Sequence, residues 1–145
     1  MQNIVLVDDD EDHLFLLERM LSRLQDQHSV AIHSFNRAHE ALEWCQNNPM
    51  SLCFSDFEMP DMDGMEFISA LREIPAMDHV PVFMITGVTD SEMHRQVREC
   101  GATGVFTKPI NLVNVLRAVS ALLHLDDSQA GVEELQRASS AQAGF

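Results

Sequence analysis

The feature that most constrains the fold is a fivefold alternation between short apolar segments and longer amphipathic ones. The apolar segments cover residues 3–7, 30–35, 51–55, 80–85 and 104–107. Three of them contain continuous apolar runs, which are typical of parallel strands covered on both faces. Five strand–helix repeats predict an open parallel sheet with right-handed crossovers and helices on both sides. The expected fold class is therefore α/β and doubly wound.

The segments between the strands carry helical periodicity. Leucines at positions 14, 17, 21 and 24 form one stripe within residues 11–25, which predicts an amphipathic helix. A helix over 90–100 is expected to begin after Asp90 as N-cap and to stop at Gly101. The longest predicted helix covers 110–125. This helix carries more apolar residues than one core stripe needs. The additional residues fit a broad core face and a partner surface equally well, so a homodimer through residues 90–125 is one expectation.

Length and composition limit the domain organisation. A chain of 145 residues is long enough for one domain and an appendage. Residues 126–145 are rich in Ala, Ser and Gln and follow no strand pattern. We expect one domain over residues 1–125 and a linker or flexible tail over 126–145.

The charge and cysteine content exclude several function classes. A formal net charge of −14 with nine scattered basic residues argues against direct nucleic-acid binding, which requires clustered Lys and Arg. The sequence has no basic-then-apolar leader and no apolar run near eighteen residues, so neither export nor membrane insertion is expected. Three cysteines without CxxC spacing fit a reducing cytoplasm, with Cys53 as a core residue.

Acidic residues follow two of the predicted strands. Asp8 and Asp9 come after the first strand, and Asp56 comes at the end of the third. The carboxyl ends of parallel strands meet at one sheet edge, so these carboxylates are expected to lie close together. They repel one another unless a cation neutralises them, and Mg²⁺ prefers carboxylate, water and phosphate oxygens. Residues 10–12 are better explained as the cap and first turn of the following helix.

Two further strand ends carry suitable chemistry. Lys108 is the only lysine of the chain and follows the fifth strand, where its ammonium could pair with a phosphoryl oxygen. Thr86 ends the fourth strand and offers a hydroxyl donor, while Gly87 leaves room for a ligand. Together these residues indicate phosphorylation of Asp56, with the carboxylate as nucleophile.

The segment between Asp56 and Gly64 is predicted to be a loop. Met59-Pro60 and Asp63-Gly64 shape it, because proline fixes φ and glycine permits a positive φ.

The order and spacing of these motifs resemble the response-regulator receiver domain of two-component signalling, of the chemotaxis-regulator type, over residues 3–125. The resemblance implies a flavodoxin-like fold with strand order 2-1-3-4-5. It implies Mg²⁺ held by Asp9, Asp56 and the backbone carbonyl of Glu58, with Asp8 assisting through water. It also implies that a histidine kinase or phosphotransfer protein phosphorylates Asp56, with Lys108 and Thr86 assisting. The protein would then signal to a downstream protein effector and would not be a dedicated enzyme.

Two positions depart from the common pattern of that family. Val105 stands where receivers usually carry a Tyr or Phe that moves together with the threonine. Phe106 is adjacent, but strand alternation is expected to point it toward the opposite face. Ile110 stands where Phe often follows Lys-Pro. These changes leave the phosphorylation chemistry intact, but the aromatic half of the usual coupling between the threonine and an aromatic residue is missing.

Three alternatives stay open on the sequence. A small aspartyl-phosphate phosphatase also begins from a strand-end aspartate, but it usually needs a cap or an extra catalytic acid. A phosphorylation-independent adaptor would keep the fold without the chemistry, and the complete acidic set argues against it. The chain could also be a receiver excised from a longer regulator, although no DNA-binding domain is expected after residue 125.

Overall fold

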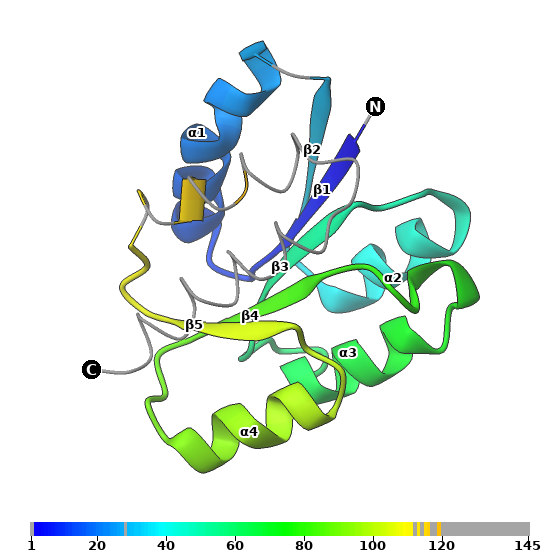
Figure 1. Cartoon of the computed structure of the whole chain (residues 1–145), viewed down its shortest axis with the longest axis vertical. Helices are drawn as coiled ribbons and strands as arrows, with labels where there is room; N and C mark the ends of the chain where they lie inside the picture. The colour runs from blue at the N-terminus through cyan, green and yellow to red at the C-terminus, as the bar shows by residue number, and fades with distance from the viewer. Residues whose placement is uncertain (1, 28, 112, 114, 117–118, 120–145) are drawn as a thin grey trace.

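The computed structural model, described for residues 2–27, 29–111, 113, 115, 116 and 119, is a five-stranded parallel sheet between two helical layers (Figure 1). The strand order is β2-β1-β3-β4-β5, which confirms the predicted topology. The strands are β1 (Gln2–Val7), β2 (Val30–Phe35), β3 (Leu52–Asp56), β4 (Val82–Thr86) and β5 (Gly104–Thr107).

Two strand boundaries differ from the prediction in a way that matters for the site. β3 and β4 each extend one residue further, so Asp56 and Thr86 are the last residues of their strands. Asp56 is in register with Ile85, and Thr86 with Thr107. The ladder therefore fixes the backbone of both residues at the carboxyl edge. At its other end β4 begins two residues later than expected, after Pro81, which lacks the N–H of a ladder donor.

The helices lie on opposite faces of the sheet. α1 (Glu11–Gln27) covers one face, while α2 (Ala38–Asn47), α3 (Gly64–Arg72) and α4 (Ser91–Glu99) cover the other (Figure 1). A 3₁₀ turn, Pro75–Met77, leads into β4. Most of the helix predicted over 110–125 lies outside the described residues, as does the predicted tail over 126–145. No helix among the described residues is long and apolar enough to span a membrane.

Strand alternation divides the core into two clusters. Ile4, Leu6 and Phe106 face α1, and Val5, Val7 and Val105 face the opposite helical layer. The predicted placement of Phe106 on the opposite face of the sheet from Val105 is thus confirmed. On the α1 face, Phe106 packs with Phe54 and Phe83 at ring-centroid separations of 5.6–6.1 Å. Cys53 is fully buried on the other face, as predicted.

The helix termini were anticipated in part. The Asp90 carboxylate accepts a hydrogen bond from the Glu92 amide at 3.1 Å, which confirms Asp90 as the N-cap of α4. Gly101 has a φ of +121°, which confirms it as the stop after that helix. Asp10 caps α1 through the amides of Asp12 and His13.

Gly64 serves a different purpose from the one the sequence suggested. Among the described residues the only glycine with positive φ is Gly101, so the conformational freedom expected at Gly64 is not used. A Cβ at Gly64 would lie 2.7 Å from the Met84 sulfur and 2.7 Å from the Phe57 ring. Close packing therefore selects glycine here. The Gly64 amide also donates to the Phe57 carbonyl at 2.7 Å, which closes the loop that follows Asp56.

The N-terminus of α2 is capped by a residue distant in sequence. Arg37 occupies the N-cap position without a side-chain bond. Instead, Asp61 accepts from the amides of Ala38 and His39 at 3.3 and 2.9 Å, and from the His39 ring at 2.8 Å. Partial burial opposes ionisation of Asp61, but the hydrogen bonds outweigh it and lower its pKa to about 2. The loop after β3 is thereby tied to α2.

We expect Asp61→Asn to lower the free energy of unfolding at neutral pH by about 1–2 kcal/mol, because the lowered pKa reflects stabilisation of the native carboxylate. This contribution is complete above the ordinary value of 3.8 and is lost as pH falls toward about 2. Urea unfolding across this range should show the two proteins converging as pH falls. The control Glu40→Gln removes an exposed charge from the same helix turn and should cost less than about 0.5 kcal/mol. A constant difference at every pH would contradict the assignment.

Candidate functional site

The predicted site residues meet at the carboxyl edge of the sheet. A cleft of about 570 Å³ opens there, lined by Asp9, Asp56, Glu58, Thr86, Gly87 and Lys108 together with Asp10, Met59 and Pro60. Asp8 is fully buried below this surface at the end of β1. Four strands thus contribute side chains or the residue that follows them, as expected for an open parallel sheet.

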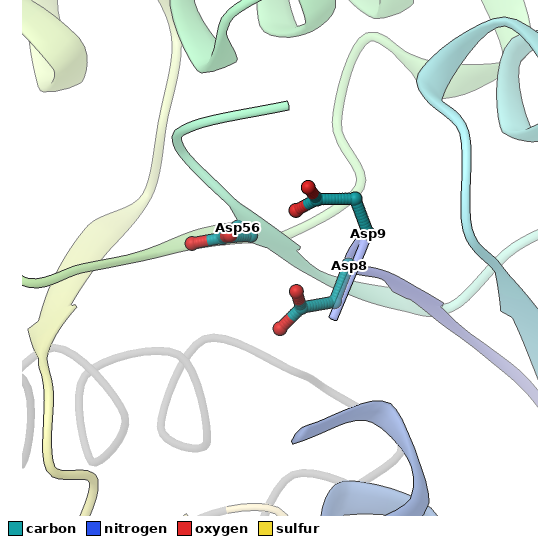
Figure 2. Close-up of side chains that lie close together, drawn as sticks. All are labelled: Asp8, Asp9 and Asp56. Atoms are coloured by element: carbon teal, nitrogen blue, oxygen red, sulfur yellow. The ribbon is translucent and has the colours of Figure 1, made fainter. Parts of the chain in front are cut away.

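Three carboxylates form an acidic cluster at the floor and wall of this cleft. Single oxygens of Asp8, Asp9 and Asp56 all lie within 4.8 Å of one another, and Figure 2 shows the three side chains reaching into a common space. Asp8 and Asp56 are buried and Asp9 is exposed. The oxygen-only donor set and the concentrated negative charge fit a hard divalent cation such as Mg²⁺.

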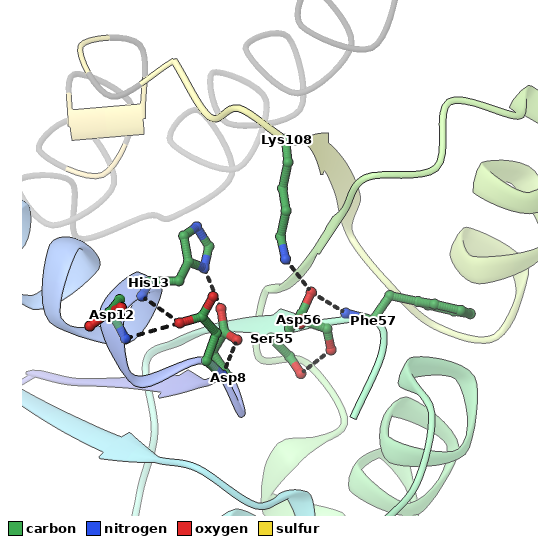
Figure 3. Close-up of polar contacts among 8 residues, drawn as sticks. Asp8, Asp12, His13, Ser55, Asp56, Phe57 and Lys108 are labelled. Atoms are coloured by element: carbon green, nitrogen blue, oxygen red, sulfur yellow. Dashed lines mark hydrogen bonds and ion pairs between the residues drawn. The ribbon is translucent and has the colours of Figure 1, made fainter. Parts of the chain in front are cut away.

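Lys108 reaches across the cleft to Asp56. Its ammonium nitrogen lies 3.0 Å from Asp56 Oδ1, which also accepts a hydrogen bond from the Phe57 amide at 3.0 Å (Figure 3). Both of these donors bind Oδ1 of Asp56. The other oxygen, Oδ2, is therefore the one available to an incoming electrophile or cation.

The ionisation of Asp56 and Lys108 reflects two competing influences. Burial is the main reason why the pKa of Asp56 lies above its usual value, and the Asp8 charge adds to it against the opposing effect of Lys108. Burial would lower the pKa of Lys108, but the hydrogen bond to Asp56 and the nearby acids raise it. Lys108 thus stays charged beside a carboxylate whose negative charge is poorly accommodated.

His13 is a neighbour of the site that the sequence prediction missed. Its Nδ1 atom hydrogen bonds Asp8 Oδ2 (Figure 3). The Asp10 amide donates to Asp8 Oδ1 at 3.0 Å. Burial would raise the pKa of Asp8, but these bonds and neighbouring positive charges lower it overall. Two residues separate His13 from the N-cap Asp10. The first turn of α1 therefore brings the ring back over the end of β1.

Thr86 lies at the side of the cleft next to β5. It is almost fully buried, and its hydroxyl oxygen accepts a hydrogen bond from the Val88 amide at 3.1 Å. The hydroxyl proton is free to be directed elsewhere, because accepting this bond does not use it. A Cβ at Gly87 would meet no atom within 4 Å, in agreement with the predicted open space beside the strand end.

Comparisons with known proteins give a consistent result. The sequence model of the response regulator receiver domain matches residues 4–120. The chain is 31% identical over 132 residues to the cyclic di-GMP phosphodiesterase response regulator RpfG of Xanthomonas campestris, covering 91% of this chain and 34% of that protein. It is 30% identical over 128 residues to the transcriptional regulatory protein SrrA of Staphylococcus aureus, covering 88% of this chain and 51% of SrrA.

Solved structures agree with the sequence comparison. The chemotaxis response regulator CheY4 of Vibrio cholerae superposes with a TM-score of 0.74 at 28% identity, covering 83% of this chain and 98% of that one. The chain spans about a third of the length of RpfG and about half of SrrA. The similarity to these two longer proteins is therefore similarity to a part of each.

We expect Asp56→Asn to raise the free energy of unfolding on the order of 1 kcal/mol at neutral pH without divalent cations, because the buried charge beside Asp8 is removed. The asparagine oxygen can still accept from Lys108 and Phe57. The raised pKa of Asp56 predicts a change in the same direction, because ionising this carboxyl then costs the native state more free energy than the unfolded state. Urea unfolding tests this, with the exposed Asp78→Asn as control. A clear loss of stability in Asp56→Asn alone would show that the carboxylate stabilises the fold.

Proposed function

The chain belongs to the response regulator receiver domain family, and we propose that it accepts a phosphoryl group on Asp56. Proteins of this family take part in two-component signalling, and the receiver fold is typical of signalling proteins rather than of dedicated enzymes. The single observation that carries the proposal is the pairing of buried Asp56 with the only lysine of the chain, beside two further carboxylates.

The proposed reaction is transfer from a phosphohistidine of a histidine kinase or phosphotransfer protein. Oδ2 of Asp56 attacks phosphorus, the new O–P bond forms, and the N–P bond breaks in line. The electron pair of that bond goes to the imidazole nitrogen, which takes a proton from solvent. Lys108 moves from Oδ1 to a phosphoryl oxygen, and Thr86 donates to another. Positioning and electrostatics provide most of the catalysis in reactions of this kind.

Receiver domains bind Mg²⁺ at an acidic pocket, and the donor set of this chain fits that ion. We assign the ion to Asp9, Asp56 and the backbone carbonyl of Glu58, with Asp8 contributing through water. When bound, Mg²⁺ supplies positive charge that offsets the three carboxylates and the incoming phosphoryl oxygens. Asp8 is held by His13 and the Asp10 amide, so its carboxylate is oriented in advance.

The phosphodonor is proposed to dock beside the cleft on α1. Phe15 and Leu16 are more than half exposed there. Leu16 also lines a largely apolar groove of about 290 Å³, together with His13, Leu17, Met20, Lys108, Pro109 and Ile110. Lys108 belongs to both the groove and the acidic cleft. A helix that carries a phosphohistidine must rest on the rim of the cleft to reach Asp56, and the groove offers that rim an apolar contact.

The remaining expectations concern the context of the domain. Signalling to a downstream protein effector, a cytoplasmic location, a domain ending near residue 125 and a homodimer through residues 90–125 stay predictions. Val113 is 64% exposed, so an apolar side chain within this range is accessible for contact in a homodimer. The alternative of a phosphorylation-independent adaptor gains no support, because Asp56, Lys108 and Thr86 keep the side chains that phosphorylation requires.

Incubation with a small phosphodonor and Mg²⁺ is expected to add one phosphoryl group to the wild-type protein and none to Asp56→Asn. Lys108→Ala should accept the group at least about tenfold more slowly, because it loses the cation that pairs with the phosphoryl oxygen. Intact-protein mass spectrometry over time measures both effects. Equal phosphorylation of wild type and Asp56→Asn would place the acceptor elsewhere.

Leu16→Ala should reduce the efficiency of transfer from a phosphorylated histidine phosphotransfer protein by about fivefold, because the donor loses an apolar contact. Transfer from a small phosphodonor should be unchanged, since that donor needs no docking face. The control Gln25→Ala alters an exposed residue near the far end of α1. If Leu16→Ala and Gln25→Ala both behave like wild type with the protein donor, the docking face is wrong.

A further inference from the structure

Both backbone polar groups of Val88 form hydrogen bonds with side chains, one from the end of β4 and one from α4. Its amide donates to the Thr86 hydroxyl oxygen at 3.1 Å, and its carbonyl accepts from His94 Nε2 at 2.6 Å. A carbonyl oxygen can only accept, so Nε2 of His94 must carry the hydrogen. One peptide segment thus connects the cleft to α4.

His94 is an unusual residue for its position. α4 is otherwise strongly polar, and within it only His94 and Val97 are buried. Burying an imidazole costs free energy unless its polar atoms find partners. A hydrophobic side chain would fill this position at lower cost, so the bond to Val88 is the feature that distinguishes histidine here.

The segment between β4 and α4 is otherwise open. Residues 87–90 are exposed, and no atom crowds the position of a Cβ at Gly87. Packing therefore restrains this segment weakly. Both polar backbone groups of Val88 are nevertheless engaged, one by the cleft and one by the helix.

A phosphoryl group on Asp56 would change the first of these bonds. It adds acceptor oxygens and negative charge beside Thr86. When the Thr86 side chain rotates about χ1 to bring its hydroxyl within donating distance of them, its oxygen moves relative to the Val88 amide. The Val88 peptide must follow or lose that bond, and its carbonyl then shifts against His94. Val105 has no polar side-chain atom with which to play such a part.

We propose that His94 is the positioning residue that transmits the state of Thr86 to α4 through Val88. This inference rests on the proposed phosphorylation of Asp56. In it, His94 replaces the coupling function of an aromatic residue at position 105. The surface that changes on phosphorylation is the exposed segment 87–90 together with the start of α4.

The test compares amide hydrogen exchange of residues 87–99 before and after phosphorylation by a small donor. His94→Phe keeps a ring without a donor, His94→Leu is a second donor-free variant, and His94→Gln keeps an N–H. His79→Leu is the control, because its side chain is 95% exposed. Intact mass reports phosphorylation of each protein separately.

We expect exchange in this segment to change by at least about threefold in wild type, His94→Gln and His79→Leu. The donor-free variants should gain the phosphoryl group normally but show little change on phosphorylation. A wild-type response in a folded donor-free variant would overturn the inference. So would phosphorylated wild type without any change in residues 87–99. Absence of a mass gain in wild type would instead overturn the proposed function.

Discussion

The site depends on the close placement of three carboxylates at one sheet edge. The parallel ladder pairs β1 with β3 up to Val7 and Ser55, so the residues that follow, Asp8, Asp9 and Asp56, begin side by side at the sheet edge. Lys108 offsets part of the charge from the end of β5. Burial, with the Asp8 charge added to it, keeps the pKa of Asp56 above its usual value despite Lys108. A divalent cation is the ligand that this excess negative charge favours, and a negatively charged phosphoryl group is accommodated once that cation is bound.

The sequence predicted a parallel sheet because apolar runs and amphipathic segments alternate along the chain, while the strand order was implied by the resemblance to the receiver domain. It also predicted that Phe106 and Val105 lie on opposite faces, since neighbouring side chains alternate along a strand. Strand ends were placed one residue short at Asp56 and Thr86. Polar residues at the end of a strand can still form ladder hydrogen bonds, and a prediction based on hydrophobic patterning does not include them in the strand.

Hydrogen bonds and close contacts between separate elements account for what the sequence did not predict. Asp61 caps α2 from a loop more than twenty residues away, and no local motif records that partnership. His13 and His94 contact Asp8 and the Val88 carbonyl because helix turns bring them there. Gly64 was expected to be useful for its φ, but the nearby Met84 sulfur and Phe57 ring are what require it. Such contacts become visible only when the elements are packed.

Calorimetric titration with Mg²⁺ tests the central claim most directly, because the acidic cluster is the constraint from which the rest follows. The account predicts one ion bound per chain to the wild-type protein and at least about tenfold weaker binding to Asp9→Asn, which loses a proposed ligand with an exposed side chain. Asp78→Asn, which removes an exposed carboxylate outside the cluster, should bind like wild type. Equal binding by wild type and Asp9→Asn, or no binding by either, would contradict the account.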